Sequence, residues 1–365
     1  MAPKPLIPHD VVFYVPAIAP LLAGGGGLPP GGAETQVALI ARALAARGAR
    51  VAVVAFAVEG LPRAFDGVAV VPRAPHSGSP PREAAEIVRT LRRAPSRVVV
   101  TRQAGAHTGL VALGARLLRR RFVYSSANVV DFDFGSLERH PLKRALYELG
   151  VRLASEIVVQ TDEQVELCRA RYRRDPPRIR SIAEPARPRA GAGDAFLWVG
   201  RVVGYKQPLA YVELARAVPE ATFRMVAVPE RTEPELLAEL RAAAAATPNL
   251  ELLDPRPRPD VMALVERAVA VVLTSSSEGM PNVFLEGWVR GVPALTLAHD
   301  PDRIVERHGL GGTAHGSPER LAELARDLWA RREELAELGE RCRAYVAAEH
   351  SAEAVGAAWA RALAL

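Results

Sequence analysis

Two glutamates lie eight residues apart in the segment SEGMPNVFLE, residues 277–286. The apolar stretch 268–273 before it is typical of a buried parallel strand, and Pro281 suits the first turn of a helix. Glu278 would then precede the free N–H groups of a helix start, and Glu286 would lie about 7–8 Å along the helix axis. Carboxylates accept hydrogen bonds from hydroxyls and free N–H groups attract anions, so the segment fits a sugar carried on a nucleoside diphosphate. For either glutamate alone, an ordinary acidic residue in the first turns of a helix is the alternative.

Two cations flank one loop in the segment VGRVVGYKQP, residues 199–208. Arg201 follows a predicted strand, and Lys206 precedes a predicted helix whose first turn can hold Pro208. The two side chains could clamp two phosphates and stabilise the charge that develops as a diphosphate leaves. The alternative is a solvated pair of surface cations. Only three of the 47 basic residues are lysines, which favours a function for Lys206.

A glycine-rich loop at residues 22–35 precedes the first long predicted helix. Its last glycines, Gly31 and Gly32, would let backbone N–H groups approach an anion at the helix start. The tight Gly-x-Gly-x-x-Gly turn of dinucleotide-binding folds is missing, and no Gly-Lys-Ser/Thr follows, which excludes a nucleotide P-loop. A surface loop without a ligand is the alternative.

These loops need strands and helices to hold them, and the chain alternates between the two. Such alternation predicts parallel sheets covered by helices. Strands are predicted at 11–15, 51–56, 68–71, 98–101, 122–124, 157–160, 195–199, 222–228, 250–252, 268–273 and 294–297. Helices are predicted at 34–47, 82–93, 109–120, 142–154, 162–172, 207–218, 233–246, 261–267 and 283–290, followed by a helical tail from 318.

The alternation is interrupted by a Pro/Gly/Ala-rich segment at 184–194, which is typical of a linker. At 365 residues the chain also exceeds one typical core. We therefore predict an α/β protein with two Rossmann-like, doubly wound parallel-sheet domains, at 1–183 and 195–350. Ligands of such sheets bind beyond the carboxyl ends of the strands, so the expected site is a cleft between two facing domains.

Composition excludes several other classes of protein. Apolar residues make up 49% of the chain and charged residues 24%, as in a globular protein. Cys168 and Cys342 have no partners at metal-ligand spacing, so neither a disulfide framework nor a zinc site is predicted. A reducing cytoplasm is the expected location, since we find no secretory signal and no apolar run near the ~20 residues that span a bilayer. The net charge of +6 fits anionic ligands or an anionic membrane surface, whereas few aromatic residues and no recognised motif argue against nucleic acid.

Together these segments resemble the family 4 glycosyltransferases of glycosyltransferase group 1, which have the GT-B fold. The resemblance rests on GGAE at 31–34, on Gly200-Arg201 with Lys206, and on EGMPNVFLEGW at 278–288. HDPDRIV and GLGG, within 299–312, also resemble the segment that follows in this family. The order and spacing extend through nearly the whole chain.

The resemblance implies a retaining enzyme that moves a sugar from a nucleoside-diphosphate sugar to a glycan, lipid-linked or small-molecule acceptor. The usual mechanism is same-face attack, in which the leaving phosphate helps to take the acceptor proton, and no metal or other cofactor is expected. Arg201 and Lys206 would bind the donor diphosphate, while Glu278 would face the donor sugar and Glu286 the ribose. The other donor-binding residues implied are Gly31, Gly32, Gly279, Met280, Pro281 and Asn282. The last helix, 351–365, would cross back to the first domain.

The N-terminal half departs from the family at one place. Many relatives carry a His near the donor after the fifth strand, whereas this chain has SSANVVDFD at 125–133. Asn128 could bind a sugar hydroxyl there but cannot act as a general base. Asp131 begins a triplet that resembles the metal-binding Asp-x-Asp of the other large glycosyltransferase fold, but the two-domain organisation argues against that fold. The other candidates for the acceptor pocket, with a structural role as an equal alternative, are Arg102, Gln103 and His107.

Two other functions stay open. A nucleotide-sugar epimerase of the same fold would need no acceptor, and a non-catalytic protein would bind the nucleotide sugar without turnover. The basic and apolar runs 117–122 and 141–147 could contact anionic lipid at the inner face of a membrane, or could be ordinary helix faces. The donor sugar and base, the acceptor and the oligomeric state are not predicted.

Overall fold

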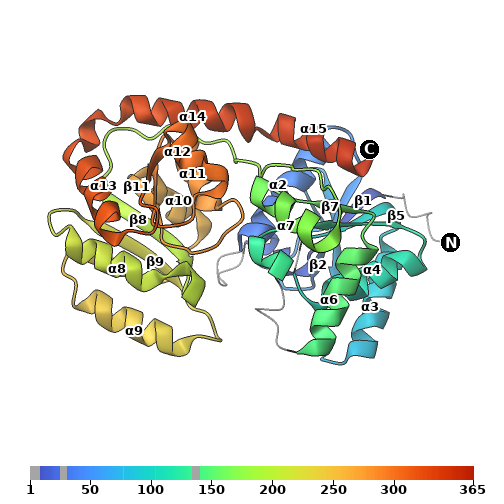
Figure 1. The fold of residues 1–365 in the computed structure, drawn as a ribbon. Coiled ribbons are helices and arrows are strands. Elements are labelled where there is room, and N and C mark those ends of the chain that lie inside the picture. Colours follow the sequence, from blue (N-terminus) through green and yellow to red (C-terminus); the bar gives the residue numbers. More distant parts are fainter. Residues whose placement is uncertain (1–8, 25–30, 77, 103, 134–139) are drawn as a thin grey trace. The chain divides into compact units, whose positions relative to one another are not determined.

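The computed structural model describes residues 9–24, 31–76, 78–102, 104–133 and 140–365. The chain divides into two compact units (Figure 1). The N-terminal unit is Met1–Ile182 together with Ala352–Leu365, and the C-terminal unit is Ala183–Ser351. The last helix of the chain therefore belongs to the N-terminal unit.

The N-terminal sheet has seven strands among the described residues, in the order β3-β4-β2-β1-β5-β6-β7. Neighbouring strands pair in parallel, except β3 with β4. The valine-rich central strands are buried on both faces, which explains why they appear in the sequence as continuous apolar runs. The strands are β1 (His9–Tyr14), β2 (Val51–Phe56), β3 (Ala64–Phe65), β4 (Val68–Arg73), β5 (Ser96–Thr101), β6 (Arg121–Ser125) and β7 (Glu156–Val158).

Helices cover both faces of this sheet. Alternate residues of β1 point to opposite sides, so that Phe13 packs with α2 and α15 while Tyr14 packs with α3, α4 and α6. Trp359 of α15 is buried against Phe13, with ring centroids 6.3 Å apart, which makes the last helix part of this core. The helical elements are η1 (Pro16–Ile18), α1 (Ala19–Ala23), α2 (Gly32–Ala46), α3 (Pro80–Arg93), α4 (Ala106–Leu117), η2 (Val129–Asp133), α6 (Pro141–Leu153), α7 (Asp162–Tyr172) and α15 (Ala352–Leu363).

The C-terminal sheet is parallel in all its described pairings and has the order β10-β9-β8-β11-β12-β13. Its strands are β8 (Ala195–Arg201), β9 (Phe223–Val228), β10 (Leu250–Leu253), β11 (Ala268–Leu273), β12 (Ala294–Thr296) and β13 (Gly311–Thr313). The sequence did not predict β13. Its first residue, Gly311, has φ 147°, and a Cβ there would lie 1.8 Å from the carbonyl oxygen of Ala294. The pairing with β12 therefore needs a glycine at this position, and glycine is not a residue typical of strands.

Helices also cover both faces of the C-terminal sheet. One core contains Trp198 with α8, α9 and α13, and the other contains Leu197 with α10, α11 and α14. The helix α11 begins at Asn282, so Pro281 caps it rather than lying in its first turn as expected from the sequence. The helical elements are η3 (Gly204–Lys206), α8 (Pro208–Ala217), α9 (Pro234–Ala245), α10 (Arg258–Glu266), α11 (Asn282–Trp288), η4 (Pro301–Arg303), α12 (Ile304–His308), α13 (Pro318–Ala330), η5 (Arg332–Glu334) and α14 (Ala336–Glu349).

Each sheet is doubly wound, which confirms the predicted fold class. The strand order reverses between β1 and β5 in the N-terminal sheet and between β8 and β11 in the C-terminal sheet. Open α/β sheets bind ligands beyond the carboxyl ends of the strands at such a reversal. The loops after β8 and β11 are therefore where the C-terminal unit is expected to bind a ligand.

Candidate functional site

In the C-terminal unit, the residues predicted to bind an anion and a sugar lie between the end of β8 and η3, and between the end of β11 and the first turns of α11. The strand β8 ends at Arg201 and is followed by η3, which ends at Lys206. The strand β11 ends at Leu273, and residues 274–281 lead from it to α11. Because β8 and β11 are neighbouring parallel strands, both loops start from the same edge of the sheet.

Hydrogen bonds join these two loops. The backbone N–H of Ser276 donates to the carbonyl oxygen of Tyr205 at 2.8 Å. The hydroxyl of Thr274 donates to the carbonyl oxygen of Lys206 at 2.7 Å and accepts from Trp198 Nε1 at 3.0 Å. Thr274 is fully buried, so these bonds are shielded from water. The fold therefore sets the position of the Lys206 backbone.

Lys206 and Glu278 form an ion pair across the two loops, 72 residues apart in sequence. Lys206 Nζ donates to Glu278 Oε1, and the hydroxyl of Ser275 donates to the same oxygen at 2.8 Å. The side chains of Lys206 and Glu278 are 19% and 11% exposed. In such a partly dehydrated place a cation attracts an anion more strongly than at the open surface.

Arg201 lies at the same edge of the sheet but has other partners. Its Nη1 donates to Glu230 Oε2 at 3.1 Å, and its Nη2 donates to the hydroxyl of Tyr205 at 3.3 Å. Burial lowers the pKa of Arg201, but Tyr205 and Glu230 outweigh this effect and the net shift is upward. The guanidinium is therefore a permanent cation, held beside η3 by one carboxylate and one hydroxyl.

Glu286, the second predicted glutamate, pairs with a residue that the sequence analysis missed. Arg258, the first residue of α10, places its Nη1 2.6 Å from Glu286 Oε1 and its Nη2 3.3 Å from Glu184 Oε2. Burial lowers the pKa of Arg258, but the two carboxylates raise it further than burial lowers it. Arg258 lies in the Arg/Pro-rich stretch 256–259, where nothing in the composition distinguishes it from the other arginines of the chain.

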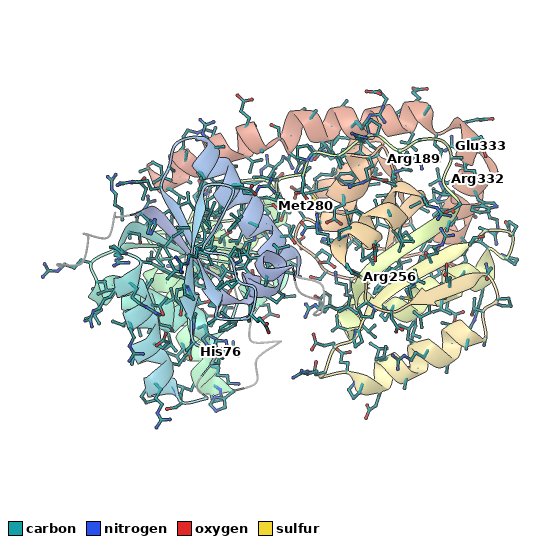
Figure 2. The ribbon with its side chains drawn as sticks, turned by 180° about the vertical axis from the view of Figure 1, so that it is seen from behind. His76, Arg189, Arg256, Met280, Arg332 and Glu333 are labelled. Carbon is teal, nitrogen blue, oxygen red and sulfur yellow. The ribbon has the colours of Figure 1, made fainter. Side chains whose placement is uncertain are left out.

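The start of α11 is anchored in the core of the C-terminal unit. Met280 is 8% exposed and Phe284 is fully buried, and both belong to the same apolar cluster (Figure 2 labels Met280). The side chain of Met280 is thus a packing group, and only its backbone is suited to bind a ligand. With Gly279 before it and Pro281 after it, Met280 fixes the path of the loop toward Asn282.

In the N-terminal unit, the predicted glycines lie at the start of α2. Gly31 is the N-cap residue and Gly32 is the first residue of the helix. A Cβ on Gly31 would lie 2.4 Å from Glu34 Oε2, the end of a flexible side chain. Of the earlier glycines of this loop, Gly24 is the C-cap residue of α1, and Gly25 to Gly27 lie outside the described residues.

Arg102, one of the acceptor-side candidates, is buried at the carboxyl edge of the N-terminal sheet. Arg102 follows β5, is 5% exposed and donates from Nη1 to the hydroxyl of Ser125 at 2.8 Å, whereas its Nε has no partner among the described residues. Burial lowers the pKa of Arg102 to about 10. Gln103, the next candidate, lies outside the described residues.

Asp131 and Asn128 belong to one compact loop after β6. Asp131 Oδ2 accepts from the hydroxyl of Ser126 at 3.0 Å and from the backbone N–H groups of Ala127 and Asn128 at 2.7 Å and 3.2 Å. Burial raises the pKa of Asp131, and these donors oppose the shift. Asp131 therefore stabilises its own loop. Asn128 is half-buried, and its Oδ1 accepts from the N–H of Val130 at 3.3 Å.

His107 lies in a cluster that the sequence analysis did not find. Glu83 Oε1 lies 3.1 Å from His76 Nδ1 and 3.7 Å from His107 Nε2 (Figure 2 labels His76). The same carboxylate pairs through both oxygens with buried Arg73, at 2.6 Å and 3.1 Å. His76, Glu83 and His107 resemble a metal-ligand set, but a metal ion would have to share Glu83 with the guanidinium of Arg73.

None of the helices that the structure describes is both long and apolar enough to cross a membrane.

Two family models match the chain. Residues 31–184 match the Glycosyl transferase 4-like domain, and residues 193–331 match the Glycosyl transferases group 1 domain. Together the two models cover most of the sequence, in the order that the two units have along the chain. The chain therefore belongs to the group 1 glycosyltransferases with a family-4-like N-terminal domain.

Solved structures show the same fold. HepE of Anabaena, in complex with UDP and glucose, has a TM-score of 0.74 at 17% identity, over 98% of this chain and 99% of that chain. Sucrose-phosphate synthase from Thermosynechococcus elongatus has a TM-score of 0.76 at 13% identity, over 97% and 98% of the two chains. WaaG, a glycosyltransferase involved in lipopolysaccharide biosynthesis, has a TM-score of 0.68 at 19% identity, over 95% and 98%. The fold is GT-B, as predicted.

Proposed function

We propose that this glycosyltransferase moves a sugar from a nucleoside diphosphate to an acceptor hydroxyl with retention of anomeric configuration. The contact between Lys206 and Glu278 carries the proposal. A diphosphate needs a cation, and sugar hydroxyls need a hydrogen-bond acceptor. In the structure the two groups neutralise each other, and a bound donor would give Lys206 to the phosphates and leave Glu278 to the sugar.

The other charged residues at this edge have complementary roles. Arg201 supplies a second cation for the diphosphate from the end of β8. Arg258 holds Glu286 in place, so that the carboxylate can accept hydrogen bonds from ribose hydroxyls without reorganising. Backbone groups from Gly279 to Asn282 would support the sugar and the phosphates. Gly31 and Gly32 of the N-terminal unit would contact the donor through backbone N–H groups.

The proposed chemical step is a same-face displacement. The bond between the anomeric carbon and the phosphate oxygen breaks, and its electron pair stays on the diphosphate, whose growing charge Arg201 and Lys206 stabilise. The acceptor oxygen attacks from the face that the diphosphate leaves, and its proton passes to the departing phosphate. The proposal needs no metal, because two side chains supply the cations.

We propose a glycan, a lipid-linked glycan or a small molecule as the acceptor, bound by the N-terminal unit. Arg102 and Asn128 are the described candidates with polar groups suited to acceptor hydroxyls or to an acidic substituent. Asp131 is better suited to holding its loop than to binding a ligand, because its Oδ2 already accepts three hydrogen bonds.

A donor panel tests this function. The purified chain is incubated with UDP-, GDP- and ADP-sugars, with UDP-sugars first because HepE was solved with UDP and glucose. Release of nucleoside diphosphate that depends on an acceptor, together with a product of unchanged anomeric configuration by NMR, is the expected result. Isomerisation of the donor without an acceptor would identify an epimerase, and tight binding without turnover would identify a binding protein. An inverted product would contradict retention.

A further inference from the structure

Exposed leucines are concentrated on two helices of the N-terminal unit. Six large apolar side chains are exposed among the residues that the structure describes, and two of them, Val58 and Leu365, lie on other elements. The other four are Leu113 and Leu117 of α4, which are 41% and 66% exposed, and Leu142 and Leu149 of α6, which are 60% and 40% exposed.

The four leucines lie on two helices that pack closely against each other. Residues four or seven positions apart lie on the same face of a helix, so each helix presents its two leucines together. The helices α4 and α6 touch through backbone atoms, since a Cβ on Gly109 would lie 2.1 Å from the carbonyl oxygen of Leu146, and one on Gly150 would lie 2.6 Å from the nitrogen of Gly109. Figure 1 shows the two helices side by side.

The charge around these leucines is almost entirely positive. Residues 106–121 contain four arginines and no carboxylate, and residues 141–155 contain three cations and one carboxylate. The two segments together carry a net charge of +6, as much as the whole chain. Their one carboxylate, Glu148, pairs with Arg171, which lies outside both segments, and lies 3.9 Å from Arg152 of the second segment.

An arginine-lined pocket lies where α4 ends. Arg116, Arg119, Arg120 and Arg121 line it together with Leu153. The guanidinium groups of Arg120 and Arg121 donate to backbone carbonyl oxygens at 2.8 Å and 2.9 Å. Those of Arg116 and Arg119 have no hydrogen-bond or ion-pair partner in the described part of the chain, and both residues are exposed. Two guanidinium groups without partners among the described residues, next to two that hydrogen bonds hold in place, are suited to bind a phosphate.

We propose that the α4–α6 face, defined by the four leucines and the four arginines, docks the N-terminal unit on an anionic lipid surface. The leucines would enter the boundary between headgroups and acyl chains, and the arginines would bind lipid phosphates, as interfacial segments of mixed basic and apolar character do. The single sign of the charge favours a lipid surface over a protein partner, whose interface would combine both signs. The inference rests on this face alone and is independent of the donor chemistry.

Vesicle co-sedimentation tests the docking. The full chain is mixed with phosphatidylcholine vesicles that contain about 30 mol% phosphatidylglycerol, and with vesicles of phosphatidylcholine alone. We expect binding to the anionic vesicles at about 0.1 M salt, little binding to the neutral ones, and loss of binding at about 0.5 M salt, because salt screens charge.

Variants locate the surface. The double variants Leu113→Ser/Leu117→Ser and Arg116→Glu/Arg119→Glu should each weaken vesicle binding at least about tenfold, with thermal unfolding and donor binding unchanged. The matched controls Val58→Ser and Arg241→Glu, which alter exposed residues elsewhere, should bind like the parent. Equal binding to both kinds of vesicle, or parent-like binding by both double variants, would overturn the proposal. So would a dimer in solution that the leucine variant abolishes, because a second copy would then cover this face.

Discussion

Each sheet carries a cation–carboxylate contact at its carboxyl edge, and the two contacts differ in burial. Arg73 and Glu83 of the N-terminal unit have side chains that are 0% and 7% exposed, and both carboxylate oxygens face the guanidinium. Lys206 and Glu278 of the C-terminal unit are 19% and 11% exposed and meet through one carboxylate oxygen. The first pair therefore lies in the protein interior, and the second lies where solvent still reaches.

The difference separates a structural pair from one that can exchange partners. Removing one member of a buried, fully engaged pair leaves an uncompensated charge in the interior, which costs several kcal/mol. Removing the carboxylate partner of a partly exposed lysine costs less free energy, because water or a ligand phosphate can replace the carboxylate. We therefore propose that Arg73 and Glu83 stabilise the fold and that Lys206 and Glu278 bind the ligand. Three changes test that division and a fourth tests the Arg258–Glu286 pair, from the largest expected effect to the smallest.

Arg73→Met should destabilise the N-terminal unit by about 3–5 kcal/mol, because Glu83 would stay buried without its cation. Urea unfolding followed by circular dichroism measures the loss. The matched control Arg63→Met removes an exposed arginine from the same unit and should change stability by less than about 0.5 kcal/mol. Similar values for the two variants would break the distinction between structural and exchangeable pairs.

Glu83→Gln should make stability depend less on pH. Burial raises the pKa of Glu83, but Arg73 outweighs it and holds the value at about 2, below the ordinary 4.5. Because the folded pKa is depressed, the carboxylate stabilises the fold fully above about pH 4.5 and loses that effect as pH falls toward 2. The parent should exceed the variant by about 3 kcal/mol at pH 7, with a smaller gap at pH 3. A gap that stays constant, as expected for the exposed control Glu163→Gln, would argue against the assignment.

Lys206→Ala should reduce kcat/KM for the donor about 100-fold, equivalent to about 2.7 kcal/mol, because the leaving diphosphate loses a cation. Thermal unfolding should stay close to that of the parent, in contrast to Arg73→Met. The control Arg241→Ala removes an exposed cation from α9 of the same unit and should leave kcat/KM unchanged. If Lys206→Ala unfolds at a lower temperature than the parent and keeps the parent's kcat/KM, Lys206 and Glu278 stabilise the fold rather than bind the donor.

Arg258→Ala should raise the donor KM about tenfold with little change in kcat, because Arg258 acts only by orienting Glu286. Glu286→Ala should have a similar effect, and the double variant should be no worse than either, because the two side chains act as one unit. A donor whose ribose lacks its hydroxyls should bind parent and variants alike. Glu286 does not bind the ribose if the effects of the two substitutions on KM add, or if the variants are weakened equally for that donor and for the normal donor.

Most of the fold could be predicted because long elements have strong patterns. The buried valine-rich strands and the longer helices match their predicted ranges to within a few residues, as with β2 at Val51–Phe56. The missed elements are short, and packing rather than periodicity determines them. Ala64–Phe65 is a two-residue strand that pairs only with its neighbour β4, and Gly311–Thr313 consists mostly of glycine.

Local order along the chain was enough to select the loop residues of the candidate site in the C-terminal unit. Glu278 and Glu286 lie in one short segment, and Lys206 lies just before a helix that begins with a proline. Helix propensity and capping determine the structure of such short segments. The partner of each glutamate was beyond such reasoning. Glu278 meets Lys206 from 72 residues away, because β8 and β11 are neighbours in the sheet. Glu286 meets Arg258 from 28 residues away, because α10 and α11 cover the same face. Long-range packing alone separates Arg258 from the many other arginines of the chain, whereas the scarcity of lysine already distinguished Lys206.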